Sequence, residues 1–176
     1  MDNDLSATQA IRLRRSIRKY KKDGMVTDEQ LHLLLEAAMM APSACNTRPW
    51  KFIVIRNRMV LDELATVHPY AGMLKTASLA IILLALPDTQ EGISEGYYPQ
   101  DCGAATQNIL IQAAAIGLGT CWCGVYPKMN RMAELRMILK IPDDSPLVPF
   151  NIIAVGVPDG IPSAHGFYDS SKVRFL

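Results

Sequence analysis

Apolar and polar residues follow two different periods along the chain, and the change of period separates helices from strands. Residues 27–41, TDEQLHLLLEAAMMA, place apolar side chains three and four positions apart, as on one face of a helix. The members of this stripe are Leu31, Leu34, Leu35 and Ala38. Thr27 and Gln30 have the spacing of a capping box, which predicts where this helix begins. Residues 77–86, ASLAIILLAL, are almost continuously apolar; the run is too short to span a bilayer and predicts a buried central strand.

The other elements are predicted from the same periods and from turn residues. Helices are expected over residues 6–15, 59–67, 101–119 and 127–139, and strands over residues 50–56, 120–125 and 148–158. Residues 87–99 predict a loop, and residues 159–176 an irregular C-terminal arm. Strands and helices alternate without an internal repeat or a linker. We therefore expect a single domain over residues 1–176, of the mixed α/β or α+β class, with a central sheet flanked by helices.

The helix expected from residue 101 is the longest and is rich in alanine. Asp101 stands at its positive end, where a carboxylate is favourable, and Gly117 is typical of a C-terminal stop. The alanines of this helix are small enough to let another helix approach closely. They are Ala104, Ala105, Ala113, Ala114 and Ala115.

Composition places the chain among ordinary globular proteins. Apolar residues make up 49% of the 176 residues and charged residues 20%, unlike a disordered chain. The net charge of +1 does not favour a nucleic acid or a membrane surface as partner. The N-terminus carries Asp2 and Asp4 and lacks an early apolar stretch, so no signal peptide is expected. The four cysteines then predict reduced thiols and a cytoplasmic location.

The cations are concentrated in residues 12–22, where the candidate chemistry begins. Within RLRRSIRKY, residues 12–20, arginine side chains can pair with a phosphate through two hydrogen bonds, and serine adds a neutral donor. The candidates for a compact phosphate or ribityl site near a helix end are Arg14, Arg15, Ser16 and Arg18. A solvated basic surface is the alternative interpretation, and the spacing alone leaves both open.

A second candidate lies at the junction of a helix and a strand, in APSACNTRPWKFIVI, residues 41–55. Pro42 ends the helical spacing, and an apolar strand begins at Trp50. The small polar residues between them would present backbone N–H groups and an amide to a flat heterocycle. The candidates are Pro42, Ser43, Ala44 and Asn46. A helix stop followed by a capped turn is the alternative interpretation.

Three other motifs do not support a site. Gly-Leu-Gly at residues 117–119 closes a helix and precedes a strand, whereas the dinucleotide fingerprint follows a strand and opens a helix. Cys121 and Cys123 alternate to the same face of a strand, but a thiolate metal site needs further ligands nearby. The histidines are scattered and predict no Ser/His/Asp arrangement. They are His32, His68 and His165.

Three blocks, taken together and in order, resemble the nitroreductase family of FMN-dependent oxidoreductases. The blocks are RRSIRKY, APSACNTRPWKFIVI and DCGAATQNILIQAAAIGLGTCWCG. Each block alone is common, whereas the ordered set is specific. The resemblance covers residues 14–157, nearly the whole chain, and the length is similar to that of compact members of the family.

The resemblance implies the nitroreductase fold, with two FMN molecules at the interface of a homodimer and the alanine-rich helix at the centre of that dimer. The phosphate and ribityl chain would be held by Arg14, Arg15, Ser16 and Arg18. The block reaching the flavin from the other subunit would be Pro42, Ser43, Ala44 and Asn46, with Trp50 anchoring the next strand in the core. The stretch passing the flavin ring, largely through backbone groups, would be Thr120, Cys121, Trp122, Cys123 and Gly124.

The chain departs from the family pattern in two places. Arg48 stands where the family usually has glutamine, either as an added cation near the flavin edge or as a surface charge. Many members also carry a Lys-x-Arg pair in the C-terminal arm as a second phosphate clamp. His165 and Phe167 stand at the expected positions here, and Lys172 and Arg174 lie further along without an assigned role.

The resemblance implies an FMN-dependent oxidoreductase that uses NAD(P)H to reduce nitroaromatics or quinones in alternating half-reactions. The flavin carries the chemistry, so no catalytic side chain is expected, and nearby cations and N–H donors would raise its reduction potential. Candidates for stacking on the acceptor are Tyr70, Tyr97, Tyr98 and Trp122. The alternatives are related flavin chemistry such as reductive dehalogenation, a non-catalytic FMN-binding module, and a thiolate metal protein.

Overall fold

The computed structural model describes residues 5–163, 166 and 168–176, and a four-stranded sheet lies at its centre. The strands are β1 (Trp50–Ile55), β2 (Leu79–Ala85), β3 (Gly119–Gly124) and β4 (Val148–Gly156). Their order across the sheet is β1–β2–β4–β3, and every neighbouring pair is antiparallel. This sheet, with helices around it, confirms the predicted α+β class.

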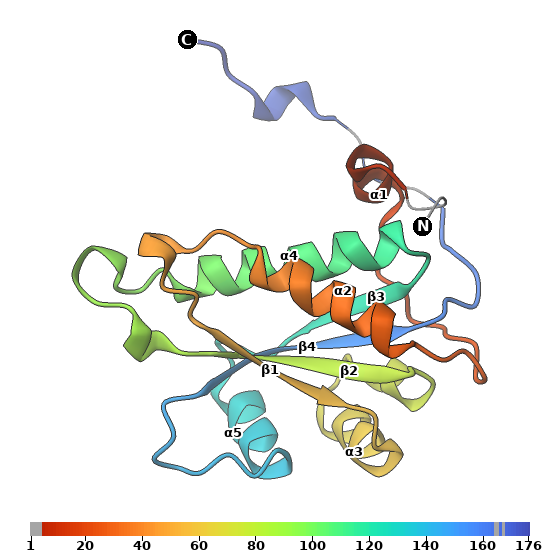
Figure 1. The fold of residues 1–176 in the computed structure, drawn as a ribbon, viewed down its shortest axis with the longest axis horizontal. Helices are drawn as coiled ribbons and strands as arrows, with labels where there is room; N and C mark the ends of the chain where they lie inside the picture. The colour runs from red at the N-terminus through yellow and green to blue at the C-terminus, as the bar shows by residue number, and fades with distance from the viewer. Residues whose placement is uncertain (1–4, 164–165, 167) are drawn as a thin grey trace.

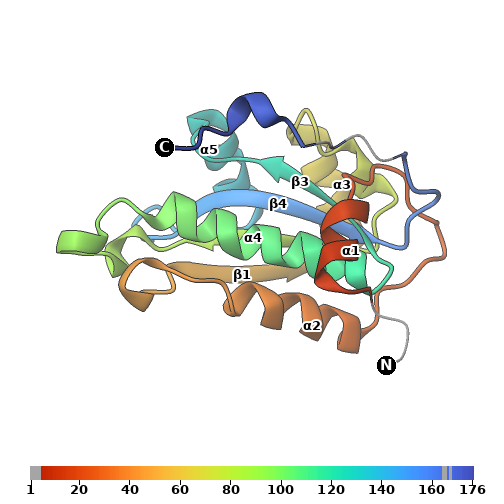
Figure 2. The ribbon, with the colours of Figure 1, turned by 90° about the horizontal axis from the view of Figure 1, so that it is seen from above.

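Helices cover both faces of the sheet, as Figure 1 shows: α2 and α4 lie over one face, and α3 and α5 lie over the other. Figure 2 shows α1 at the C-terminal end of α4. The two helical layers match two apolar clusters, with Leu34 and Ile109 in the first and Leu61 and Leu135 in the second. The helices are α1 (Ala7–Leu13), α2 (Asp28–Met39), α3 (Arg58–Val67), α4 (Tyr98–Ala115) and α5 (Met129–Ile138). Among the described helices, none has the length and apolar content that a membrane span requires.

The central strand β2 explains the continuously apolar run in the sequence. Every residue of β2 is buried, because helices cover both of its faces and strands flank both of its edges. Its odd-numbered residues join the cluster under α2 and α4, and its even-numbered residues join the cluster under α3 and α5. A strand that is buried on both faces needs no alternation of polar residues.

Several helix ends follow the predicted caps. Thr27 caps α2 through the predicted capping box with Gln30. Gly117 follows α4 with a φ of +76°, the left-handed conformation of a C-terminal stop. Ser6 and Gln9 form a second capping box at the start of α1, which is shorter than predicted at its C-terminal end.

Two helix starts differ from the prediction. α4 begins at Tyr98 instead of residue 101, because Pro99 fits the first turn of a helix, where its missing N–H is not needed. The predicted loop before it contains two short 3-10 turns, Pro87–Thr89 and Gly92–Ser94. α5 begins at Met129 instead of residue 127, because Lys128 at its N-cap has extended backbone angles and separates Pro127 from the helix.

An extended segment after α1 runs along the edge of the sheet. The Ile17 N–H donates to the Thr120 carbonyl at 2.8 Å, and the Tyr20 hydroxyl lies 2.9 Å from the Ile17 carbonyl oxygen. Ile17 packs so closely on Gly119 that a Cβ at position 119 would lie 2.9 Å from three Ile17 carbons. Only glycine allows this approach, and the approach places residues 14–18 beside β3.

The C-terminal arm leaves the body of the protein. Figure 1 shows the C-terminal segment reaching beyond α1, away from the sheet. The segment contains one short 3-10 turn, Ser170–Lys172. Its apolar side chains have little cover from the rest of the described chain, since Tyr168 is 75% exposed and Phe175 is 89% exposed. The assignment of the whole chain to one domain stays a prediction.

We expect Gly119→Ala to destabilise the protein by about 1–3 kcal/mol, because the added Cβ would overlap Ile17 where the N-terminal segment attaches to β3. Urea denaturation measures this change in the free energy of unfolding. Gly124→Ala on the same strand is the matched control. In the described part of the chain the space within 4 Å of its added Cβ is open, so the cost should stay below about 1 kcal/mol. Equal stabilities of the two variants would contradict the close contact.

Candidate functional site

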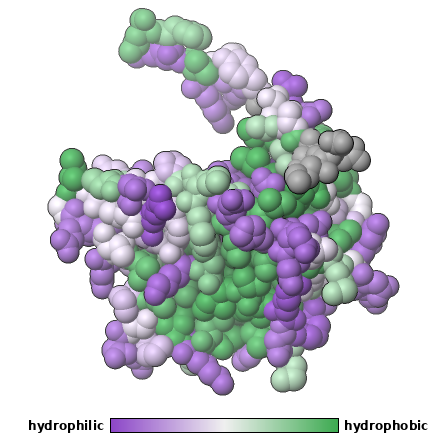
Figure 3. All heavy atoms as spheres, in the orientation of Figure 1, coloured by the Kyte–Doolittle hydropathy of each residue, from purple (hydrophilic) through white to green (hydrophobic). Residues whose placement is uncertain are grey.

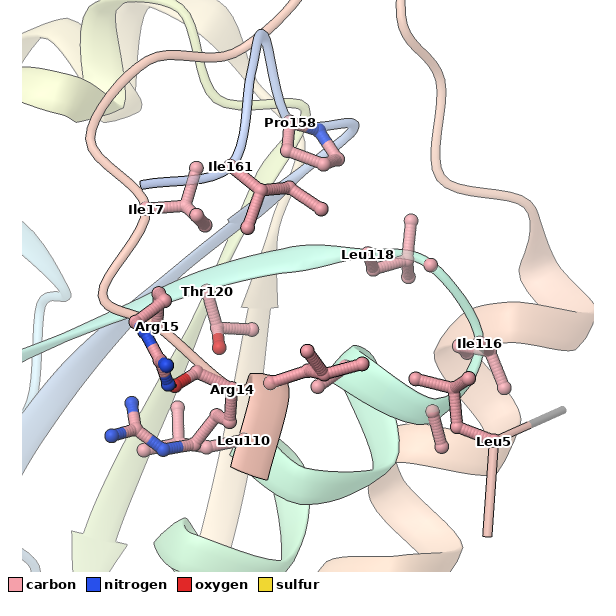
Figure 4. A pocket seen from close by; sticks show the side chains of 14 residues that line it. Leu5, Arg14, Arg15, Ile17, Leu110, Ile116, Leu118, Thr120, Pro158 and Ile161 are labelled. Atoms are coloured by element: carbon pink, nitrogen blue, oxygen red, sulfur yellow. The ribbon is translucent and has the colours of Figure 1, made fainter. Parts of the chain in front are cut away.

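Arg14, Arg15, Ile17 and the start of β3 border a cavity of about 460 Å³ at the C-terminal end of α4, whereas Ser16 and Arg18 line a separate, neighbouring pocket with Asp159 and Gly160. Figure 4 shows Arg14 and Arg15 at one end of this cavity, with their guanidinium groups close together. Apolar side chains, among them Ile116 and Leu118, line the other end. The cavity thus combines cations with apolar walls, which suits a ligand that has both an anionic group and an apolar part.

The arginines of this block differ in their hydrogen bonds. The Arg15 guanidinium donates to the backbone carbonyls of Arg12, Arg14 and Ser163, so its Nε and Nη1 donors already have partners. The guanidinium groups of Arg14 and Arg18 have no hydrogen-bond or ion-pair partner among the described residues. Arg14 and Arg18 therefore keep their donors available for an anion.

The arginine block lies next to the β3 stretch that was predicted to pass the same cofactor. Ser16 and Thr120 form an isolated parallel bridge, so backbone contacts hold the two segments together. Cys121 and Cys123 point into the core under α3 and α5 and are each 3% exposed, whereas Trp122 is 38% exposed. Contacts of the two cysteines with a cofactor would therefore come from their backbone groups. β3 is an edge strand; residues 16 and 17 pair with its outer side at Thr120, and from Cys121 to Gly124 no strand of the described chain pairs with that side.

The thiols of Cys121 and Cys123 are neighbours inside this core. The Cys123 thiol lowers the pKa of Cys121 to about 7, and Arg18 and Arg14 act in the same direction. The neighbouring Cys121 thiol, together with burial, raises the pKa of Cys123. Among the described residues, no group of three or more His, Cys, Asp or Glu side chains could hold a metal ion. The pair is therefore part of the core beneath β3.

The second block forms a tight loop between α2 and β1. Trp50 starts β1 with its side chain buried, as predicted. Pro42 follows the end of α2 and precedes this loop. The Arg48 N–H donates to Ser43 Oγ at 2.9 Å, and the Asn46 N–H donates to the Ser43 carbonyl at 3.0 Å. Ser43 thus closes the loop with both its side chain and its backbone.

The backbone of this loop is strained. Cys45, Asn46 and Arg48 have φ values of +50°, +57° and +50°. The left-handed conformation costs an L-residue on the order of 1–2 kcal/mol, although asparagine tolerates it better than most. Residues of this kind persist where surrounding contacts impose them, and they are frequent at ligand sites.

Arg48 orients the side chain of Asn46. The Arg48 Nε–H donates to Asn46 Oδ1 at 3.0 Å. Arginine has donors only, so the amide oxygen must face it and the amide NH2 group must face away. The Asn46 NH2 group has no partner among the described residues. It therefore offers two donors to a ligand, and Arg48 has a defined role in place of the expected glutamine.

The first and second blocks lie at opposite ends of α4. The cavity beside Arg14 is lined by Gly117, just after α4, whereas the Ala44 N–H donates to the carboxylate of Asp101 in the first turns of α4. An α-helix rises 1.5 Å per residue, so positions 101 and 117 lie about 24 Å apart along the axis. A single chain therefore does not bring the two blocks together. β3 spans part of the distance, since Trp122 lies beside the first half of α4.

The aromatic candidates do not form one group. Tyr98 and Trp122 belong to a row of rings whose neighbouring centroids are 5.7, 5.8 and 6.4 Å apart, with two other aromatic rings between them. Tyr97, just before α4, is exposed. Tyr70 lies on the other face of the sheet, where its carbonyl accepts a hydrogen bond from Cys123 Sγ. Tyr98 and Trp122 therefore belong to one row of rings but do not contact each other.

A buried polar cluster under the second block is a feature that the sequence did not reveal. The Asp101 carboxylate accepts hydrogen bonds from the Ala44 N–H at 3.1 and 3.2 Å and from Gln90 Nε2 at 2.7 Å. Gln90 Nε2 also donates to Thr47 Oγ1 at 3.2 Å. The one signal in the sequence that could have indicated this cluster is the acidic Asp101 on the buried face of a helix, directly before the fully buried Cys102.

The C-terminal positions of the expected phosphate clamp, His165 and Phe167, lie outside the described residues. Lys172 forms an ion pair with Asp169 at 3.9 Å. Arg174 is exposed. Neither Lys172 nor Arg174 lines the cavity beside Arg14, so the described arm adds no cation to that cavity.

Fold and site together define a class of protein: an antiparallel α+β protein that carries polar ligand groups at both ends of one long helix, with a cation-lined cavity at one end. A sequence profile described as the nitroreductase family matches residues 11–68 and 65–157. The chain belongs to the nitroreductase family, which confirms the resemblance of its three blocks.

Three relatives illustrate the match. A Methanothermobacter thermautotrophicus protein, provisionally named an NADH dehydrogenase/NAD(P)H nitroreductase, is 41% identical over 97% of this chain and 86% of its own. A crystal structure with the same provisional name, from Parabacteroides distasonis, has a TM-score of 0.88 and 35% identity over 96% of both chains. A provisionally named nitroreductase from Desulfovibrio desulfuricans, solved in complex with FMN, has a TM-score of 0.81 and 31% identity over 98% of both chains. These names agree with the predicted class of enzyme and with the predicted cofactors.

Cys102 makes the stability of the α4 region dependent on pH. Burial raises the pKa of its thiol to about 12, and the neighbouring Asp101 carboxylate acts in the same direction. A cysteine in an unfolded chain has a pKa of about 8.5. Between these two values the unfolded state releases a proton that the folded state keeps. Stability is therefore lost as the pH rises through this window, by up to about 1.4 kcal/mol per pH unit.

We expect Cys102→Ala to make the alkaline loss of stability less steep. Urea denaturation at a series of pH values above about 8.5 gives the slope for the parent and for the variant. The difference between the slopes isolates Cys102 from other buried groups that titrate in the same range, such as Tyr20, whose pKa burial also raises. Equal slopes would show that the Cys102 thiol ionises alike in the folded and unfolded states.

Proposed function

We propose that the protein is an FMN-dependent oxidoreductase that uses NAD(P)H to reduce electron-poor acceptors, such as nitroaromatics and quinones, in alternating half-reactions. The observation that carries the proposal is the cavity beside Arg14, where a guanidinium without a partner in the described chain lies next to the start of the edge strand β3. The family relationship and the names of the relatives support it. When bound, FMN supplies the chemistry, taking two electrons from NAD(P)H and passing them to the acceptor.

The arginine block suits the anionic end of FMN. Arg14 and Arg18 have donors available, and a guanidinium binds phosphate through two parallel hydrogen bonds. Ser16 adds a hydroxyl at a position that the bridge to β3 holds in place. Arg15 adds positive charge, while its own donors support the backbone of the block.

The outer edge of β3 and the second block suit the ring of FMN. Backbone groups at Cys121, Trp122, Cys123 and Gly124 would hold one side of the ring. The Asn46 amide would supply hydrogen-bond donors to it, with Pro42, Ser43 and Ala44 beside that amide. Because the two blocks lie about 24 Å apart in one chain, the Asn46 group must come from a second copy. Trp122, a partly exposed residue of β3, would provide a surface on which an aromatic acceptor could stack.

The homodimer that this arrangement requires has apolar surfaces available to it. Small or apolar side chains of α4 are only partly buried within the chain; they include Gly103, Ala104, Ile111, Ala114 and Ala115. Along the sheet edge, Phe52, Ile53 and Val54 of β1 are also partly exposed. Figure 3, in the orientation of Figure 1, shows a broad apolar surface in the middle of the face that is turned toward the viewer. The four free cysteines fit a reducing compartment, and we propose a cytoplasmic location.

The proposal is tested by mixing the protein anaerobically with FMN, then with NADH or NADPH, and then with a nitroaromatic compound or a quinone. We expect the flavin absorbance to bleach with the nicotinamide and to return with the acceptor. Bleaching that only a halogenated aromatic reverses would replace the proposed acceptors with dehalogenation. Bound flavin that NAD(P)H reduces no faster than free FMN would identify a non-catalytic FMN-binding module.

We expect Arg14→Ala to weaken FMN binding ten- to a hundredfold, on the order of 1.5–3 kcal/mol, because a charge-assisted hydrogen bond to the phosphate is lost. Quenching of FMN fluorescence measures the Kd. Lys22→Ala is the matched control, since Lys22 is an exposed cation of the same basic segment that does not line the cavity beside Arg14.

Binding of riboflavin distinguishes contacts to the phosphate from contacts to the flavin ring. It lacks the phosphate, so its Kd should be the same for the parent and for Arg14→Ala. An Arg14→Ala variant that binds FMN as tightly as the parent would refute the phosphate assignment.

A further inference from the structure

Hydrogen bonds inside the 43–48 loop close its backbone but do not attach it to the rest of the protein. The Arg48 N–H donates to Ser43 Oγ at 2.9 Å. The Thr47 N–H and Oγ1 lie 3.1 and 3.0 Å from the Ala44 carbonyl oxygen. All of these groups belong to the loop itself. The position of the loop relative to α4 and β1 must therefore depend on another contact.

The carboxylate of Asp101 provides that contact. It lies under the loop, is 7% exposed, and accepts the Ala44 N–H with both of its oxygens at 3.1 and 3.2 Å. The Gln90 Nε2 group reaches the same carboxylate at 2.7 Å and Thr47 Oγ1 at 3.2 Å. Asp101 thus holds the loop directly through Ala44 and indirectly through Gln90 and Thr47.

Both partners of Asp101 are donors, so both of its carboxylate oxygens act as acceptors. Gln90 is 5% exposed, and its Oε1 atom is buried without a hydrogen-bond partner in the described part of the chain. The amide therefore keeps its NH2 group toward Asp101 and leaves its own oxygen unsatisfied, which is favourable only opposite an acceptor. The position of Asp101 in the first turns of α4 adds a favourable interaction with the helix dipole.

We propose that Asp101 is a positioning residue of the FMN site, which acts through Ala44 and Gln90 to hold the 43–48 loop so that the Asn46 amide donors face the cofactor. This inference rests on the proposed function. Asp101 lies beneath the loop and acts on FMN through the loop. If Asp101 loses one of its two acceptor oxygens, the loop should become mobile, and Cys45 and Asn46 should leave their strained backbone conformation.

The test is Asp101→Asn, which keeps the size of the side chain but replaces one acceptor oxygen by an NH2 group, which then faces either the Gln90 NH2 group or the Ala44 N–H. We expect FMN to bind roughly tenfold more weakly or worse, as the loss of a charge-assisted hydrogen bond implies. A second measurement needs no flavin. Cys45 is the exposed cysteine of the loop, whereas Cys102, Cys121 and Cys123 are buried. The rate at which a thiol reagent labels Cys45 should rise several-fold in the variant.

A rescue variant separates positioning from general damage to the fold. In Asp101→Asn/Gln90→Glu, the new carboxylate at position 90 accepts from the new amide at position 101, while the amide oxygen still accepts the Ala44 N–H. We expect this double variant to recover both the FMN affinity and the slow labelling of Cys45. Glu95→Gln removes an exposed carboxylate in the segment just before α4 and should match the parent.

Two results would overturn the inference: parent-like FMN affinity in Asp101→Asn, or weakened binding that Gln90→Glu does not restore. If the parent itself fails to bind FMN, the proposed function fails, and the labelling rates still decide whether Asp101 holds the loop. If Asp101→Asn does not fold, Gln90→Leu takes its place, because it removes only the contacts to Asp101 and Thr47. The same weakening of FMN binding and the same faster labelling are then expected.

Discussion

Helix α4 packs along one face of the sheet and holds the two candidate ligand blocks apart. It lies there because its buried face consists of small and apolar side chains, among them Cys102, Ala105, Ile109 and Ala113, that join the core cluster over β2 and β4. Its C-terminal end borders the cavity beside Arg14, and its first turns carry Asp101. A ligand that touches both blocks therefore needs two copies of the chain. In the proposed function, the dimer is a condition of the site.

Within each block, some polar groups form hydrogen bonds with the protein itself. These hydrogen bonds leave neighbouring donors available for a ligand. Arg15 gives its donors to backbone carbonyls and supports the segment from which Arg14 reaches into the cavity. Arg48 occupies the oxygen of the Asn46 amide and leaves the NH2 group for a ligand. These side chains are already oriented before a ligand binds, so less of the binding free energy is spent on ordering them.

Much of the fold could be predicted from the sequence because the relevant signals are local. The continuous apolar run predicted β2, and the stripe and capping box of residues 27–41 predicted α2. The starts of α4 and α5 were less predictable, because proline fits the first turn of a helix only when the backbone around it is already helical. Pro99 meets that condition, whereas the extended angles of Lys128 keep Pro127 outside its helix. Local composition did not distinguish these two cases.

The sequence by itself determined most of the secondary structure, the α+β class and the three blocks that carry the family resemblance, since periodicity, caps and motif order are properties of residues close together in the chain. Only the tertiary structure decided that Ser16 lies beside Thr120, that Arg15 gives donors to backbone carbonyls while Arg14 does not, and that Asp101 supports a loop 57 residues earlier in the chain. Hydrogen bonds between residues so far apart depend on how the layers pack. The packing arises from the apolar burial of the whole chain, which no short stretch of sequence contains.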